Sequence, residues 1–283
     1  MIDLHVHSTY SDGTLNPQEL IRLAAETGVE ALALCDHNTV AGLPEFLAAA
    51  EGSGIEAIPG VEFSPDFGER ELHILGLFIQ PQHYSAVTAL VNELWQRKEQ
   101  SNLLLIQRLD GAGIHLDYET IKSQTPGGQV NRAVIAAEMV RLGYCSSVKE
   151  AFSKWLSQKH GFFVPPKRLD ALQTIGFIKS IGAVAVLAHP FLNLDPDGLR
   201  QFLPLAKEHG LDGMEVYYSK FDGKATALAA ELAQEFHLLP SGGSDFHGTN
   251  KPDTFLGTGR ANLCIPPVIL ENLRSLQNPQ KYR

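Results

Sequence analysis

Cysteine is scarce in this sequence, and long apolar runs are missing. The 283 residues include only three cysteines, at positions 35, 145 and 264. An odd number of widely spaced cysteines argues against a disulfide framework and favours a reducing, cytoplasmic setting. No run of 18 apolar residues occurs, so no membrane-spanning helix is expected. The first strand is expected to begin at Ile2, so no signal peptide is expected ahead of it.

Excess positive charge is also missing, with one local exception. The formal net charge is −9, which argues against a broad surface that wraps duplex nucleic acid. Residues 95–170, however, contain 11 Lys and Arg against 7 Asp and Glu, whereas the rest of the chain contains 12 against 25. An acidic body therefore carries a mildly basic middle segment.

The pattern of apolar residues predicts seven strands that mostly alternate with helices. The strands are expected at residues 2–7, 31–35, 55–63, 72–79, 183–188, 213–218 and 238–243. Too few residues separate the third strand from the fourth for a crossover helix, and Pro59-Gly60 is expected to break the third. Residues 81–166 are expected to be helical, with helices at 87–109, 133–142 and 148–156. This order indicates an α/β fold, a distorted relative of the (β/α)8 barrel with an inserted helical subdomain.

Two histidines lie in the first expected strand. Apolar residues at positions 2, 4 and 6 alternate with polar residues at 3, 5 and 7. His5 and His7 are therefore expected on one face, about 6.5–7 Å apart along the strand. Two imidazoles at this spacing can bind one metal ion or two neighbouring ions. By themselves they are equally compatible with an ordinary half-buried strand.

Further histidines and carboxylates stand at or next to the ends of the other expected strands, where barrels of this class build their sites. With the first pair they form a set of nine candidate metal ligands: His5, His7, Asp12, His37, Glu62, His73, His189, Asp245 and His247. Scattered core or surface histidines are not expected to gather in this way. Asp36, directly before His37, is expected either to orient that ligand or to form the turn.

The composition of the candidate set points to its chemistry. Imidazole and carboxylate suit Mn2+ first, with Zn2+ or Fe2+ as alternatives, and the absence of cysteine excludes a structural cysteine-type zinc site. Nine ligands are too many for one ion, so two or three ions are expected. Such ions suit in-line displacement at phosphorus by a metal-bound hydroxide, with His189 or His247 as a candidate proton donor. Deamination or amide hydrolysis stays open as an alternative.

Seven short motifs together resemble the PHP (polymerase and histidinol phosphatase) superfamily over nearly the whole chain. They are DLHVHS at 3–8, SDGT at 11–14, CDHNT at 35–39, PGVE at 59–62, HILG at 73–76, AHP at 188–190 and GSDFHG at 243–248. The resemblance implies a distorted (β/α)7 barrel formed by residues 1–80 and 167–283, with residues 81–166 as a helical insertion that caps a trinuclear site. It also implies a grouping of the ligands: His5, His7, Glu62 and Asp245 around one ion; Glu62, His73 and His189 around the second; Asp12, His37 and His247 around the third.

Within the superfamily the chain looks most like phosphoesterases that remove the 3′-phosphate from 3′,5′-nucleoside bisphosphates, whose relatives also trim short RNA from the 5′ end. The resemblance implies a small nucleotide or short oligonucleotide as substrate, with no duplex nucleic acid, no membrane and no obligate protein partner. Arg132 falls where that group has an Arg-Pro-His-Ile-Ala-like run, although Ala133 and Val134 replace the Pro and His. Arg132 and Arg97 are candidate phosphate contacts; each is also compatible with a solvated helix position.

Two other interpretations stay open. The chain could be a histidinol phosphatase, or a non-catalytic, metal-stabilised PHP module of the kind that serves polymerases. Such modules often lose ligands, whereas all nine candidates are present here.

Overall fold

The computed structural model describes residues 1–125, 130–260 and 263–277. The chain divides into two compact units, one made of Met1–Ala89 and Leu169–Arg283, the other of Leu90–Arg168. We call them the barrel unit and the helical unit. The first boundary falls inside helix α3 (Tyr84–Gly111). Whether the helical unit caps the site stays a prediction.

A seven-stranded sheet forms the centre of the barrel unit, in the order β1-β2-β3-β6-β7-β8-β9. The strands are β1 (Ile2–Val6), β2 (Ala31–Leu34), β3 (Glu56–Phe63), β6 (Ile74–Leu77), β7 (Val184–Leu187), β8 (Gly213–Tyr218) and β9 (Leu239–Gly243). A separate two-stranded hairpin pairs β4 (Asp66–Phe67) with β5 (Arg70–Glu71). The pattern of apolar residues predicted all seven strands of the large sheet but not this hairpin.

Strand β6 runs antiparallel to both of its neighbours, β3 and β7. This direction follows from the short connection after β3, which has no room for a crossover helix. The expected break in β3 was wrong, because the strand is continuous through Pro59-Gly60. The pair marks a change of partner instead: β3 is parallel to β2 up to Pro59 and antiparallel to β6 from Gly60.

The two edges of the sheet meet just beyond the end of β9. Asp245 N donates to His5 O at 2.8 Å, and His7 N donates to Phe246 O at 3.0 Å. The sheet is therefore a nearly closed barrel, as the sequence predicted. The closure brings residues 245–247 beside β1, although the chain separates them by about 240 positions.

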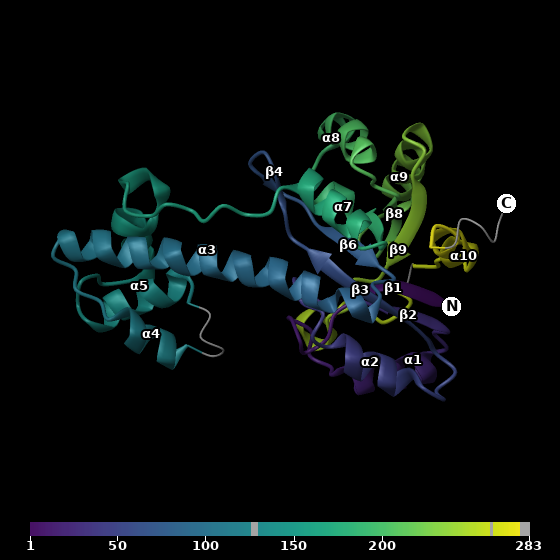
Figure 1. Cartoon of the computed structure of the whole chain (residues 1–283), viewed down its shortest axis with the longest axis horizontal. Helices are drawn as coiled ribbons and strands as arrows, with labels where there is room; N and C mark the ends of the chain where they lie inside the picture. Colours follow the sequence, from purple (N-terminus) through teal and green to yellow (C-terminus); the bar gives the residue numbers. More distant parts are fainter. Residues whose placement is uncertain (126–129, 261–262, 278–283) are drawn as a thin grey trace. The chain divides into compact units, whose positions relative to one another are not determined.

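Helices cover the outside of the barrel. They are α1 (Pro17–Thr27), α2 (Leu43–Ala50), α7 (Ala171–Ser180), α8 (Pro196–Glu208), α9 (Gly223–Glu235) and α10 (Val268–Ser275). Figure 1 shows α1 and α2 side by side near β2 and β3, while α7 and α9 pack on the strands β6 to β9. Helix α1 begins with a capping box: Asn16 Oδ1 accepts from Glu19 N at 2.8 Å, Glu19 Oε2 accepts from Asn16 N at 2.9 Å, and Pro17 follows.

An irregularity in β1 determines which of its side chains face the barrel core. Ile2 and Leu4 belong to the core with Ala33 of β2 and with Cys35, which directly follows β2. The register between β1 and β2, however, shifts between Asp3 and Val6. After the shift Val6 is aligned with Leu34 of β2. Because side chains alternate along a strand, Leu34 points away from the core that Ala31 and Ala33 face. His5 and His7, on either side of Val6, therefore turn to the interior, as bulges near active sites often achieve.

The helical unit has a core of its own. Leu105, Ile135 and Met139 are fully buried in it, and they come from α3 and α5 (Arg132–Arg141). Helix α4 (Tyr118–Gln124) completes this packing. The expected helix at 148–156 is only partly α-helical, because α6 (Val148–Ala151) continues as a π-helical turn over Phe152–Leu156. Among the helices of the described residues, none combines the length and apolarity needed to cross a membrane.

Candidate metal centre

Glu62 lies at the centre of the candidate ligands. Its side chain is fully buried on β3. One oxygen, Oε2, lies 3.1 Å from His37 Nδ1 and 3.3 Å from Nε2 of both His5 and His7. The other, Oε1, lies 2.8 Å from His73 Nδ1 and 3.1 Å from His189 Nε2. The carboxylate thus faces five histidines that come from four different segments.

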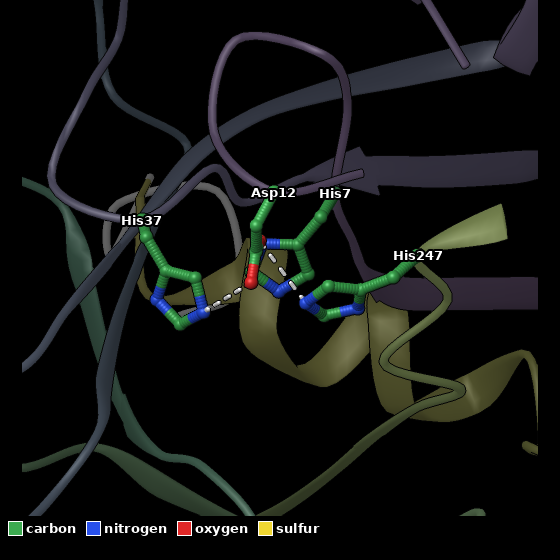
Figure 2. A group of neighbouring side chains, drawn as sticks. All are labelled: His7, Asp12, His37 and His247. Atoms are coloured by element: carbon green, nitrogen blue, oxygen red, sulfur yellow. Dashed lines mark ion pairs between the residues drawn. The ribbon is translucent and has the colours of Figure 1, made fainter. Parts of the chain in front are cut away.

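Asp12 gathers a second group at the more exposed edge of the site. Figure 2 shows the side chains of His7, His37 and His247 directed toward its carboxylate. Asp12 Oδ1 lies 3.2 Å from His247 Nε2 and 3.7 Å from His7 Nδ1, and Oδ2 lies 3.9 Å from His37 Nε2. The Asp12 side chain is 55% exposed, whereas those of His7 and His247 are buried. This group is therefore the part of the site that solvent reaches most directly.

Asp245 completes the arrangement on the side of β9. Its Oδ1 lies 3.4 Å from His7 Nε2, 3.4 Å from His247 Nδ1 and 3.9 Å from His5 Nε2. His5 and His7 themselves approach to 3.1 Å between their Nε2 atoms. The two histidines are thus close enough to contribute to one ion or to two neighbouring ions.

Eight of the nine candidate residues fall into three overlapping groups whose ligand atoms lie within 4.8 Å of one another. The groups are His7, Asp12, His37 and His247; His5, His7 and Asp245; and His37, Glu62 and His73. His189 is outside them but contacts Glu62. The structure thus brings the nine residues together, with His7 and His37 each shared between groups. Their division among three ions, and their role as ligands, stay predictions.

The donor set fits a group of cations. Four buried polar atoms of the candidate ligands have no hydrogen-bond partner within the described residues: Nδ1 of His7, His37 and His189, and Oε2 of Glu62. Buried polar atoms are rarely left in this state, because an unpaired group loses its hydration without compensation. Divalent ions would give such lone pairs a partner, and the mixture of imidazole and carboxylate suits transition metals.

The electrostatic coupling inside the cluster is strong. Burial alone would raise the pKa of Glu62, but His5 and the neighbouring histidines hold it well below its usual range. Burial alone would lower the pKa of His73, but Glu62 and Glu71 raise it to about 9. Burial dominates at His37 and lowers its pKa to about 4. The carboxylates are therefore negative at neutral pH, as a cation site requires.

Three residues that sequence reasoning missed hold the candidate ligands in place. Glu215 on β8 lies with Oε1 2.9 Å from His5 Nδ1 and accepts from His189 N at 2.6 Å. Tyr218 donates to Asp245 Oδ2 at 2.8 Å, and Lys251 donates to the same oxygen at 2.6 Å. Glu215 had one signal in the sequence: it is the only charged residue of the strand expected at 213–218.

Asp36 does not hold His37 by any described hydrogen bond. It accepts instead from Ser8 N at 2.7 Å and from the hydroxyls of Ser8 and Ser11 at 2.6 Å. Its carboxylate therefore fixes the loop that leads from β1 to Asp12. The hydrogen bonds of this carboxylate thus match neither expectation for Asp36, because they hold the loop after β1 rather than His37 or the turn that follows β2.

The backbone is strained at the same place. Asn38, His189 and Asp245 have positive φ angles of 51°, 28° and 56° although none is glycine. Strained residues of this kind persist only where the surrounding structure fixes them, and they gather at functional sites. Each of the three is a candidate ligand or directly follows one.

Arg97 and Arg132, the candidate phosphate contacts, both belong to the helical unit. The Arg97 guanidinium pairs with Glu93 at 2.5 Å and donates to Lys167 O at 3.5 Å. The Arg132 guanidinium stacks 3.9 Å from the Phe163 ring centroid and donates through NH1 to Leu156 O at 3.1 Å. Both side chains are held by contacts within their unit, and their roles toward substrate stay predictions.

Comparison with known proteins places this fold and cluster in a family. A family model described as PHP domain matches residues 3–158, which is more than half of the 283 residues. The chain therefore belongs to the PHP domain family, as the motifs in its sequence predicted.

Individual relatives are similar over most of the chain. A Haemophilus influenzae protein named 5′-3′ exoribonuclease is 38% identical over 246 residues, which cover 87% of this chain and 89% of the relative. A Chromobacterium violaceum protein named 3′,5′-nucleoside bisphosphate phosphatase is 30% identical over 278 residues, covering 98% and 96%. A solved structure described as an amidohydrolase from Chromobacterium violaceum, with bound sulfate and no metal, has a TM-score of 0.68 at 28% identity and covers 97% and 96%.

Proposed function

We propose that this chain is a metal-dependent phosphoesterase that hydrolyses small phosphorylated nucleotides. The observation that carries the proposal is the position of Glu62, which is buried with its two oxygens facing different histidines. A carboxylate so placed suits a bridge between divalent ions, and paired ions suit in-line displacement at phosphorus. Membership of the PHP domain family supports the same chemistry.

We propose two or three ions, with Mn2+ as the first candidate and Zn2+ or Fe2+ as alternatives. The nine residues offer more donors than one ion can take, and no cysteine is among them. Imidazole with carboxylate is a donor set that these three metals share. When bound, the ions supply Lewis acidity and an activated water.

The chain's own residues divide the remaining tasks. His247 Nδ1 lies 2.9 Å from Asp245 O. A hydrogen bond to this carbonyl oxygen requires the ring proton on Nδ1. The other nitrogen, Nε2, then has a free lone pair on the side of Asp12. This geometry favours a ligand role for His247 over proton donation. His189 stays the better candidate for protonating a leaving oxygen, since its Nδ1 has no partner among the described residues. Its ligand atom would then be Nε2, which lies 3.1 Å from Glu62 Oε1.

The names of the relatives suggest one shared substrate element. Removing the first nucleotide from the 5′ end of RNA requires hydrolysis at the phosphorus on that nucleotide's 3′ oxygen. A 3′,5′-nucleoside bisphosphate presents a phosphomonoester at the same position. The proposed substrate is therefore a nucleotide with a phosphoester on its 3′ oxygen, with the bisphosphate as the first candidate. Arg132 and Arg97 are the proposed phosphate contacts, since a guanidinium can hold phosphate through two hydrogen bonds.

Trimming of short RNA from the 5′ end is a second candidate function. A specific observation favours it: the relative named exoribonuclease is 38% identical, against 30% for the relative named phosphatase. The two functions differ only in the phosphoester on the 3′ oxygen, which is a monoester in the bisphosphate and a diester to the next nucleotide in RNA.

A single panel of substrates tests these proposals. The protein is stripped with a chelator, reloaded with Mn2+, Zn2+ or Fe2+, and given a 3′,5′-bisphosphate, a 5′-monophosphate, short RNA, histidinol phosphate and an amide substrate. We expect hydrolysis of the bisphosphate or the RNA only after reloading. Preferential turnover of histidinol phosphate or the amide would overturn the substrate proposal. A metal-loaded protein inert toward every phosphoester would point to the non-catalytic module.

A further inference from the structure

Strand β8 carries none of the nine proposed ligands, although it lies between β7 and β9, which lead to His189 and Asp245. The middle of this strand nevertheless contains Glu215, whose side chain is completely buried. A carboxylate is almost never fully buried unless it is paired. Its partners therefore indicate what it does.

The carboxylate of Glu215 joins two of the proposed ligands. Its Oε1 lies 2.9 Å from His5 Nδ1, and its Oε2 accepts from the backbone N–H of His189 at 2.6 Å. The other ring nitrogen of His5, Nε2, lies 3.3 Å from Glu62 Oε2 and 3.1 Å from His7 Nε2. His5 thus presents one nitrogen to Glu215 and the other to the candidate metal centre.

We propose that Glu215 is a positioning residue for the metal centre, a role that rests on the proposed metal-dependent function. Its carboxylate accepts the proton of His5 Nδ1, which leaves Nε2 with the lone pair that an ion needs. Neutral histidine has one protonated and one free nitrogen, and the hydrogen bond to one nitrogen decides which is free. Carboxylates behind metal-binding histidines fix the ring in this way.

The second contact acts on the backbone of His189. This residue has φ 28° and ψ 58°, a conformation that non-glycine residues adopt only when they are held in it. The hydrogen bond from its N–H to Glu215 is one such restraint. The conformation in turn determines the direction in which the His189 ring leaves the chain. One carboxylate on β8 thereby sets the orientation of one ligand on β1 and of another just after β7.

Replacing Glu215 with glutamine keeps the contact with the His189 backbone and changes the contact with His5. The side chain keeps its size, but one of its two acceptors becomes an NH2 donor. The His189 N–H is fixed as a donor, so the amide oxygen must face it and the NH2 must face His5 Nδ1. That arrangement moves the His5 proton to Nε2, where it blocks the metal position.

The test measures Zn2+ binding to the wild-type protein, Glu215→Gln and a matched control, Asp212→Asn. Asp212 directly precedes β8; it accepts from Ala185 N at 2.9 Å and pairs with Lys179 at 2.7 Å, and neither partner is a proposed ligand. We expect Zn2+ affinity to fall about 10- to 100-fold in Glu215→Gln, the loss typical for partners behind a ligand. Asp212→Asn is expected to lower thermal stability and leave the affinity unchanged.

Nitrogen-15 NMR of the Zn2+-loaded wild-type protein provides a readout that needs no variant. We expect His5 to carry its proton on Nδ1 and to bind Zn2+ through Nε2. A proton on Nε2, or a folded Glu215→Gln that binds Zn2+ as tightly as the wild type, would overturn the positioning role. Neither readout uses phosphoester hydrolysis. A wild type that binds Zn2+ with this tautomer but hydrolyses no phosphoester would therefore overturn the proposed function and support the positioning role.

Discussion

The barrel unit and the helical unit use charge in opposite ways. In the barrel unit, Glu62 is fully buried among side chains that come from distant parts of the chain. In the helical unit, the acid–base pairs Glu138 with Arg141 and Glu150 with Lys154 are local, three or four residues apart in the sequence, although Glu99 also pairs with Lys122 across two helices. Pairs of the second kind are screened by water and contribute little to stability. The buried charges of the barrel unit thus suit chemistry, whereas the local pairs of the helical unit only stabilise the helices that carry them.

The largest expected effect comes from removing the buried negative charge of Glu62 in the barrel unit; the same change in the helical unit is the control. Glu62→Gln should reduce metal affinity and phosphoester turnover by more than about 100-fold, beyond the usual loss for residues behind a ligand, because it removes the central carboxylate. The matched change Glu138→Gln should leave both unchanged, since it breaks only the local pair with Arg141. Calorimetric metal titration and turnover measure the two variants. Equal losses in both would contradict the comparison.

A pH titration sharpens the same contrast. Although burial alone would lower the pKa of His73, Glu62 and Glu71 raise it to about 9, so this ring holds a proton in the metal-free protein at neutral pH. The pKa values of His5 and His7 are raised in the same direction by the neighbouring carboxylates. Binding ions must displace these protons, so affinity should rise with pH up to about 9 and fall about tenfold per unit below it for each proton displaced. Calorimetry in buffers of different ionisation enthalpy counts the protons released.

The helical unit provides the control for that count. His115 pairs with Asp110 there at 2.5 Å and is exposed. His115→Ala should leave the number of released protons unchanged. A metal affinity that stays constant between about pH 6 and pH 9 would argue against displacement of ring protons by the ions.

A smaller effect is expected at Arg132. Arg132→Lys keeps the charge but loses the planar fork that binds phosphate through two hydrogen bonds, so KM should rise about tenfold while kcat changes little. Arg141→Lys, an exposed arginine on the same helix, is the control. A KM unchanged in Arg132→Lys would remove Arg132 from the substrate contacts and leave its stacking on Phe163 as its role.

The smallest effect is expected at Tyr218. Tyr218→Phe removes one hydrogen bond to the Asp245 carboxylate. Such a bond to a charged group contributes about 1.5–3 kcal/mol, but Lys251 still holds the same oxygen, so metal affinity should fall by less than about tenfold. Tyr84→Phe is a matched control, since the Tyr84 hydroxyl has no hydrogen-bond partner within the described residues. Equal metal affinities in the two variants would show that Tyr218 does not orient Asp245.

The sequence predicted the strands and the nine candidate residues because both depend on local patterns. Apolar runs mark strands, and His37 or Asp245 stands where such a run ends. The register shift in β1 could not be predicted, since it arises from pairing with β2. The same holds for Pro59-Gly60, which changes strand partners rather than breaking β3.

Contacts between distant residues were the other limit of prediction. Glu215 is an isolated acid in a strand until the fold places it against His5, 210 residues away. The π-helical turn after Ala151 depends on hydrogen bonds that helical periodicity does not reveal. Helix α10 was not predicted, because its segment is short and only the fold shows that its apolar residues pack on the barrel core.

The closure of the barrel has a consequence for synthesis. Because Asp245 and His247 follow β1 by about 240 residues, a growing chain on the ribosome holds His5 and His7 before these two partners have been made. Contacts of such long sequence separation form slowly, since a large loop must close first. Metal ions that bind only the closed form would then stabilise it by mass action. Metal supply during translation should therefore affect the yield of folded protein as well as its activity.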